Sequence, residues 1–265
     1  MIRIVVANQR GGSAKSTTTA ILARCFSDRG KRVLVIDADP QGSLAVILGL
    51  TPPAFLSDLL IEKLALRECI VSPRPGLDFV CGSRFTTDAE TKTMGVPGSE
   101  FLFQHVLSEY ERSYDVVLID VAPSISLFQT CAMVYTQNVL VPVDMDILSV
   151  QGATSTIHVC ETLNRMLERG LNIRTLGILP VKLNRRLAVT EVVLATLASL
   201  SERREVPVYN PIRTDQAVVK AATERQFLAD YDPKSKALED YEQLTDELIL
   251  KFKNPEGISI RAKRA

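Results

Sequence analysis

The 265-residue sequence has no tryptophan, only two histidines and five cysteines. The two histidines, His105 and His158, are too few for a metal site built from imidazoles. The cysteines are odd in number and include no C-x-x-C pair, so a zinc or iron–sulfur site within one chain is not expected. We interpret the cysteines as buried free thiols of a protein from a reducing compartment.

A net charge is also missing, because 31 Lys and Arg residues balance 31 Asp and Glu residues. Binding to nucleic acid or to a membrane surface therefore requires a local basic patch. No apolar run approaches the roughly 20 residues that a membrane-spanning helix needs. The N-terminal segment MIRIVVANQR turns polar too early for a signal peptide. These features predict a cytoplasmic protein.

What the sequence does contain is an alternation of short runs rich in Val and Ile with longer helical segments. Continuous apolar runs are typical of strands that helices cover on both faces. We therefore expect an α/β fold, a doubly wound and mostly parallel sheet whose ligands bind at the carboxyl ends of the strands. The expected strands are 2–7, 32–37, 115–120, 138–143 and 176–181, and the expected helices are 15–29, 98–112, 150–168 and 187–204.

The remaining segments complete a single predicted domain over residues 1–250. Turn residues in 70–97 surround one further short strand. The helix 98–112 is expected to begin at a Ser99 cap, and 251–265, which contains Pro255 and Gly257, is expected to be a flexible tail. The apolar face of that helix would consist of Phe101, Phe103, Val106, Leu107 and Tyr110.

The segment NQRGGSAKST, residues 8–17, is similar to a phosphate-binding loop. Such a loop reads G-x-x-x-x-G-K-[ST], and here Lys15 and Ser16 supply the lysine and the hydroxyl. Gln9 and Ala14 stand where the two framing glycines belong. The segment follows one predicted strand and opens the helix 15–29, which is the context that phosphate binding requires.

The chemistry of this loop depends on its backbone. Gly11 and Gly12 let the backbone approach an anion closely, and the free N–H groups at the start of a helix carry partial positive charge. Lys15 would then reach the β- and γ-phosphates of a nucleotide, and Ser16 would give its hydroxyl to Mg²⁺. The alternative is a Gly-Gly turn that opens a helix and binds nothing.

Carboxylates follow two of the predicted strands. VLVIDADPQGS ends a strand with Asp37 and Asp39, and YDVVLIDVAPS ends another with Asp120. At the carboxyl end of a parallel sheet they would face the crevice of the phosphate loop, where a carboxylate can hold Mg²⁺ or orient an attacking water. Taken singly, each could instead be a helix cap or a turn residue.

These segments resemble a known family. Residues 7–19, ANQRGGSAKSTTT, resemble the deviant Walker A box N-Q-K-G-G-V-G-K-T-T of ParA/Soj-type partition ATPases. DADPQGS resembles their D-x-D-P-Q segment and YDVVLIDVAPS their Walker B and switch region. LVPVDMDILSVQGATSTI and residues 231–248 are similar to later parts of the same proteins, so the resemblance covers about residues 2–250.

The resemblance implies a short ParA-type ATPase without an N-terminal helix-turn-helix extension. Such a protein binds ATP and Mg²⁺, forms a homodimer, binds DNA nonspecifically on the nucleoid and positions DNA or another large cargo. A ParB-like or other small adaptor stimulates its slow hydrolysis and releases it. A nucleotide-binding scaffold with little hydrolysis is the main alternative. A MinD-like membrane ATPase would end in an amphipathic basic helix, which Pro255 and Gly257 interrupt.

The resemblance also assigns roles to single residues. Asp39 would position the hydrolytic water, with Lys15 and Arg10 as further catalytic residues. Mg²⁺ would be held by Ser16, Asp37 and Asp120. The nucleotide would contact Gly11, Gly12, Ser13, Ala14, Lys15, Ser16, Thr17, Asn184 and Arg213, and the DNA candidates are Arg186, Lys220 and Arg225 with the tail cations Arg261, Lys263 and Arg264.

Three departures from the family pattern bear on activity. Arg10 replaces a signature lysine that in relatives reaches the partner's ATP, and its planar fork is bulkier than an ammonium. Ala14 replaces a glycine, which costs about 1–2 kcal/mol if the position needs a positive φ. Ala217 stands where the family has a further DNA-binding arginine. The anion cradle is therefore expected to survive, while the hydrolysis rate stays open.

Overall fold

The computed structural model describes residues 1–167 and 171–253. Its central feature in these ranges is a seven-stranded sheet with the order β3-β4-β2-β5-β1-β6-β7. All neighbouring strands are parallel except β3 and β4, which pair antiparallel. The expected α/β class with a mostly parallel sheet is confirmed. The strands are β1 (Ile2–Val6), β2 (Val33–Asp37), β3 (Ile70–Arg74), β4 (Leu77–Val80), β5 (Val116–Asp120), β6 (Asn138–Asp144) and β7 (Arg174–Val181).

Helices connect these strands and cover the sheet. The predicted helices 15–29, 150–168 and 187–204 correspond to α1 (Lys15–Asp28), α8 (Ile147–Met166) and α9 (Ala188–Arg204). The other helices are α2 (Ser43–Leu48), α3 (Leu56–Leu60), α4 (Leu66–Cys69), α5 (Phe85–Thr93), α6 (Leu102–Leu107), α7 (Leu127–Thr136), α10 (Gln216–Thr223), α11 (Leu228–Tyr231) and α12 (Lys236–Lys253), with 3₁₀ turns η1 (Ser99–Phe101) and η2 (Ser108–Ser113).

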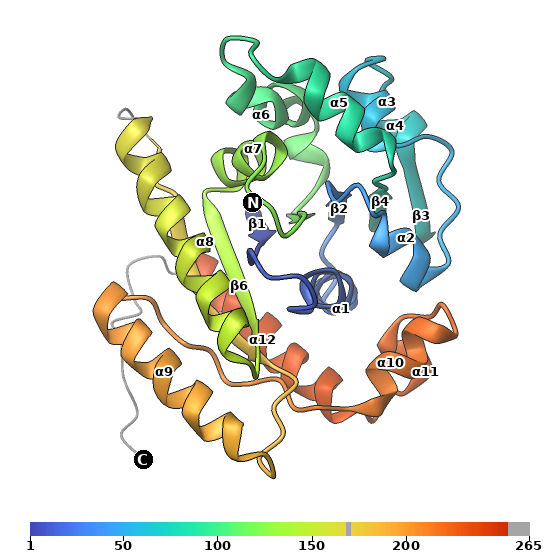
Figure 1. The fold of residues 1–265 in the computed structure, drawn as a ribbon. Coiled ribbons are helices and arrows are strands. Elements are labelled where there is room, and N and C mark those ends of the chain that lie inside the picture. Colours follow the sequence, from blue (N-terminus) through green and yellow to red (C-terminus); the bar gives the residue numbers. More distant parts are fainter. Residues whose placement is uncertain (168–170, 254–265) are drawn as a thin grey trace.

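The two faces of the sheet carry separate hydrophobic clusters, because successive side chains of a strand point to opposite sides. On β1, Val5 belongs to the cluster that contains residues of α7 and α8. Its neighbours Ile4 and Val6 belong to the cluster that contains residues of α1 and α12. Figure 1 shows α8 and α1 on opposite sides of the strands β1 and β6. All five cysteines are buried free thiols, as expected.

Two predictions about the chain between residues 70 and 112 were wrong in detail. The stretch 70–97 contains two strands, because Gly76 at φ 75° closes a hairpin between β3 and β4. Pro73 fits into β3 because this strand lies at the edge of the sheet. The helix expected over 98–112 is broken into η1, α6 and η2, and Ser99 makes no side-chain cap. Its apolar residues still face the core, with Phe103 and Leu107 fully buried.

The strand order brings the predicted site segments to one edge of the sheet. β1 lies in the centre, between β5 and β6, and the chain leaves it toward β2 on one side and later returns to β6 on the other. This reversal is a topological switch point, where a crevice forms at the carboxyl ends of the strands. Val6, at the end of β1, pairs with Asp120 of β5, and Asp37 of β2 pairs with Asp120 as well.

Candidate functional site

The loop between β1 and α1 has the backbone of an anion cradle. In the described part of the chain, no atom accepts a hydrogen bond from the backbone N–H groups of residues 11–17. Gly12 has φ 79°, and a Cβ at Gly11 or Gly12 would meet nothing within 4 Å. A run of free amides beside open space suits an anion, since successive N–H groups at a helix start attract negative charge.

Ala14 adopts the left-handed backbone conformation, the positive φ at which alanine in place of glycine is costly. Its φ is 62° and its ψ 28°, and it stands immediately before α1, whose N-terminus has no side-chain cap. A residue with a Cβ in this conformation costs about 1–2 kcal/mol relative to glycine. The loop therefore keeps the shape that a glycine would allow at this position, but under strain.

Lys15 places its ammonium at the inner side of this loop. The residue is 7% exposed, and its Nζ donates to the backbone oxygen of Arg10 at 3.2 Å. Burial lowers the pKa of Lys15, while the negative charges of Asp120 and Asp39 oppose that shift. Ser13 also donates its hydroxyl to the Arg10 oxygen, at 3.0 Å. Lys15 makes no hydrogen bond to a carboxylate of residues 1–167 or 171–253, so an anion would be its natural partner.

Asp120 is the one predicted metal ligand whose oxygens are both available. It is 0% exposed, and neither carboxylate oxygen has a hydrogen-bond partner within the described ranges. Burial raises the pKa of Asp120 to about 7, although the charge of Lys15 acts to lower it. A buried polar group without a partner is rare and usually marks a missing water, ion or ligand.

Asp37 and Asp39 lie in the same crevice but use their oxygens differently. The Asp37 carboxylate accepts from the N–H groups of Asp39 at 3.1 Å and Leu44 at 3.2 Å, so it holds the loop that leads into α2. Burial, and secondly the charge of Asp120, raises the pKa of Asp37. Asp39 is 8% exposed and accepts from Gln41 N–H at 2.9 Å.

The donor set fits Mg²⁺ better than a metal held by protein ligands alone. Across residues 1–167 and 171–253, no three His, Cys, Asp or Glu side chains gather in a metal-binding group. Mg²⁺ commonly takes one or two carboxylates and completes its shell with water and substrate phosphates. Asp120 with its two unpartnered oxygens, together with the Ser16 hydroxyl beside the phosphate cradle, could provide such a site.

A cavity of about 280 Å³ adjoins the loop. Ala14, Thr17 and Arg213, three residues predicted to contact the nucleotide, line it. Asn184 is not among the lining residues, and its side-chain oxygen accepts from Arg186 N–H at 3.1 Å in the turn before α9. The sequence prediction did not include the rest of the lining, which consists of Val181, Lys182, Ile212, Thr214, Asp215, Val218, Val219, Ala222, Ala237 and Tyr241.

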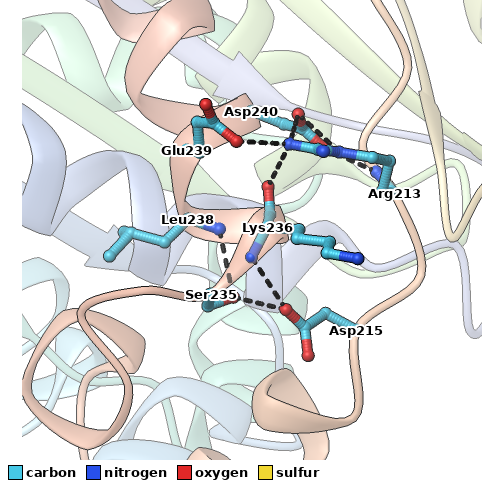
Figure 2. A network of polar contacts seen from close by, with 7 residues as sticks. All are labelled: Arg213, Asp215, Ser235, Lys236, Leu238, Glu239 and Asp240. Carbon is cyan, nitrogen blue, oxygen red and sulfur yellow. Dashed lines mark hydrogen bonds and ion pairs between the residues drawn. The ribbon is translucent and has the colours of Figure 1, made fainter.

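The Arg213 side chain is held by polar contacts to the start of α12 (Figure 2). Its guanidinium donates to Asp240 through both Nε and Nη2, and Nη2 also reaches the Glu239 carboxylate at 2.7 Å and the Lys236 backbone oxygen at 3.1 Å. Asp215 accepts from the Ser235 hydroxyl and from Lys236 N–H. Both contacts tie the cavity wall to the start of α12.

Two residues that the sequence prediction omitted join the loop to α8. Asn8 donates to the backbone oxygens of Pro142 at 2.7 Å and Ser149 at 3.2 Å, and accepts from Arg10 N–H at 2.9 Å. A Cβ at Gly152 would lie 2.2 Å from the Asn8 side-chain oxygen. Only glycine therefore allows α8 to approach so closely. The signal was an isolated glycine inside a helical pattern, which often marks a close approach.

Arg10 and the DNA candidates are exposed. The Arg10 guanidinium makes no hydrogen bond or ion pair to any described residue, although its backbone is fixed by Asn8 and Lys15. Lys220 and Arg225 lie on α10 and just after it, whereas Arg186 lies in the separate turn before α9. Ala217 is only 7% exposed, so a basic side chain there would start from a buried position. The tail cations Arg261, Lys263 and Arg264 lie outside the described residues.

None of the helices in residues 1–167 and 171–253 is both long and apolar enough to span a bilayer.

Comparisons with known proteins identify relatives over nearly the whole chain. The chain is 25% identical over 250 residues to the sporulation initiation inhibitor protein Soj of Bacillus subtilis, covering 92% of this chain and 97% of the relative. It is 28% identical over 249 residues to the chromosome-partitioning ATPase Soj of Thermus thermophilus, covering 93% and 95%.

Solved structures share the fold. A structure titled cobyrinic acid a,c-diamide synthase from Mycobacterium smegmatis, with bound ADP and magnesium, has a TM-score of 0.83 and 25% identity, covering 99% of this chain and 100% of that one. The named activities of these relatives differ, so the fold by itself does not fix the activity. The family model AAA_31, described as an AAA domain, matches residues 1–173, more than half of the sequence. The chain therefore belongs to this AAA domain family and is a P-loop ATPase of the ParA/Soj type.

Proposed function

We propose that residues 1–250 form one ATPase domain that binds ATP and Mg²⁺, dimerises and positions DNA or another large cargo. The observation that carries the proposal is the combination of free amides at 11–17, a buried lysine and a carboxylate without partners in one crevice. The buried lysine and the buried carboxylate are each costly without a partner, and a nucleotide with its metal would satisfy both and also bind the free amides. The proposed setting is cytoplasmic, on the nucleoid when ATP is bound.

Different residues are proposed to bind the phosphates, the nucleoside and the metal and to orient the attacking water. The amides of 11–17 and the Lys15 ammonium hold the phosphates, and the cavity that Thr17 and Arg213 line receives the nucleoside. Ser16 and Asp120 would hold Mg²⁺, which when bound neutralises charge on the phosphate oxygens. Asp39 lies in the same crevice and is assigned to orient the attacking water. Asp37 keeps Asp39 in place through the hydrogen bond from Asp39 N–H.

Partners are proposed from exposed charge. The Arg10 guanidinium, which is exposed and has no partner among the described residues, is proposed to reach a second subunit, as the resemblance to ParA-type ATPases implies. Arg186, Lys220 and Arg225 are proposed to contact DNA phosphates, a contact that is weak singly and accumulates in a dimer. Release would depend on an adaptor, of the ParB type or another small protein.

A second function is supported by the strain at Ala14. A chain that keeps the cradle but carries a strained residue before Lys15 could hold ATP with little turnover and act as a nucleotide-controlled scaffold. The two proposals share nucleotide binding and differ in hydrolysis.

Retention on nonspecific DNA, measured without nucleotide, with ADP and with ATP–Mg²⁺ at low and moderate salt, tests the main proposal. We expect retention only with ATP–Mg²⁺ and a steep loss of binding with added salt. Equal retention in all three states would contradict the ATP-dependent switch. Nucleotide binding without retention or phosphate release would instead select the scaffold.

A further inference from the structure

A second lysine contacts the phosphate loop from outside the segment that the sequence motif covers. Lys182 follows the last residue of β7, and its Nζ donates to the backbone oxygen of Gly12 at 2.9 Å. The same Nζ lies 2.5 Å from Oδ2 of Asp144, the last residue of β6. One ammonium therefore joins the ends of two strands to the middle of the loop.

The backbone of Lys182 is held in place for this contact. Its φ is 55°, a conformation that a side-chain-bearing residue adopts only when its surroundings impose it. The next residue, Leu183, pairs with the 212–214 segment through bonds from Leu183 N–H to Ile212 and from Thr214 N–H to Leu183, each 2.9 Å. Arg213 in that segment is fixed to Asp240 of α12.

The two lysines act on the loop in complementary ways. Lys15 binds the Arg10 oxygen from the buried side, and Lys182 binds the Gly12 oxygen from the more exposed side. With these two carbonyls engaged by cations, the amides of 11–17 remain available to an anion. This matters in a loop that has lost both framing glycines and carries a strained Ala14.

We propose that Lys182, oriented by Asp144, is a positioning residue that preorganises the phosphate loop for a nucleotide. It acts through the Gly12 carbonyl. That the ligand is a nucleotide rests on the proposed function, whereas the ordering of the loop by Lys182 does not. The ion pair contributes little to global stability, because the Lys182 and Asp144 side chains are 51% and 25% exposed.

Lys182→Met keeps the length of the side chain and removes its charge. In the protein without nucleotide, we expect faster hydrogen–deuterium exchange in peptides that span 10–17, with other regions unchanged. ADP and ATP should both bind about 10-fold more weakly by calorimetry, as for loss of one charge-assisted hydrogen bond. The Tm should fall by no more than about 4 °C.

Three further variants sharpen the test. Asp144→Asn should shift exchange and affinity in the same direction by a smaller factor. The double variant should be no weaker than Lys182→Met alone, because the two residues act through one contact. Lys92→Met, on the exposed side of α5, is the matched control and should leave exchange at 10–17 and both affinities unchanged.

The outcomes distinguish a failure of nucleotide binding from a failure of the positioning role of Lys182. A wild-type protein that binds neither ADP nor ATP would refute the proposed function, while the exchange result would still decide whether Lys182 orders the loop. Wild-type binding with unchanged exchange and affinity in Lys182→Met would overturn the positioning role. Weaker binding with unchanged exchange at 10–17 would also overturn it, since Lys182 would then act by direct contact with the nucleotide.

Discussion

The two ends of the crevice differ in how completely their polar groups are paired. At the loop end, Asp120 and the amides of 11–17 have no partners among the described residues. At the cavity wall, Arg213 and Asp215 are paired with residues at the start of α12. Unpaired buried groups lower stability unless a ligand arrives, whereas paired ones hold a shape. We therefore expect ligand binding and catalysis at the loop end, and a structural role for the residues of the cavity wall.

The largest effect is expected from removal of Asp39, the carboxylate that we propose to be catalytic. Asp39→Ala should leave ATP binding intact and reduce hydrolysis by on the order of 10²–10⁴, the usual contribution of a group that activates a water. The dimer formed with ATP should then persist. Single-turnover phosphate release is the measurement, with Asp88→Ala on α5 as the control. Release at the wild-type rate would remove Asp39 from the mechanism.

The next effect concerns the buried cation. Lys15→Gln should weaken ATP binding on the order of 100-fold, because the phosphates lose a charged partner that burial keeps from water. Calorimetry with ATP and Mg²⁺ measures it, and Lys92→Gln serves as control. An unchanged Kd would mean that the loop binds no phosphate.

A smaller effect is expected at the exposed edge of the loop. Arg10→Ala should weaken ATP-driven dimerisation about 10-fold, as for loss of one charged contact across an interface. Light scattering over a concentration series with ATP gives the dimer constant. Nucleotide affinity of the monomer should not change, and a dimer constant equal to wild type would contradict the assignment.

A substitution in the cavity wall should lower the free energy of unfolding. Asp215 accepts from Ala217 N–H at the start of α10, and Asp215→Ala should destabilise the fold by about 1–2 kcal/mol, as for loss of a helix cap. Burial acts to raise the pKa of Asp215, but hydrogen bonds from Ala217 N–H and the Ser235 hydroxyl outweigh it and leave that pKa lowered.

A carboxylate whose pKa is lowered by folding stabilises the protein above its unfolded pKa of about 3.9 and loses that contribution as pH falls through the folded pKa. The stability difference between wild type and Asp215→Ala should therefore shrink below about pH 4. Denaturant unfolding at pH 7 and pH 3 measures it, with Glu62→Gln as an exposed control. A pH-independent difference would exclude this linkage.

The smallest expected effect relieves strain in the loop. Ala14→Gly should raise stability by up to about 1 kcal/mol, because relief of the left-handed Cβ is partly offset by the greater freedom of glycine in the unfolded chain. Thermal unfolding should show a Tm rise of about 2–4 °C for a domain of this size. A lower Tm would mean that the Ala14 methyl group stabilises the fold by packing.

Predictions from the sequence succeeded where a signal is local. The five continuous apolar runs became β1, β2, β5, β6 and β7, because a buried parallel strand needs continuous hydrophobic residues. The prediction of one helix at 98–112 failed because its apolar residues can pack against the core equally well from short 3₁₀ and α-helical segments. Only one of the two strands in 70–97 was predicted, since Pro73 is compatible with a strand such as β3 only at the edge of a sheet, and edge position is not visible in the sequence.

The candidate site was likewise only partly predictable from the sequence. The sequence by itself determined the loop, its helix, Lys15, Ser16 and the strand-end aspartates, since each is carried by a short motif. Only the tertiary structure decided that Asp37 and Asp120 are register partners, that Gly152 admits Asn8, and that Lys182 reaches Gly12 across 170 positions. Strand order and register bring these groups together, and they depend on how every helix packs against the sheet rather than on neighbouring residues.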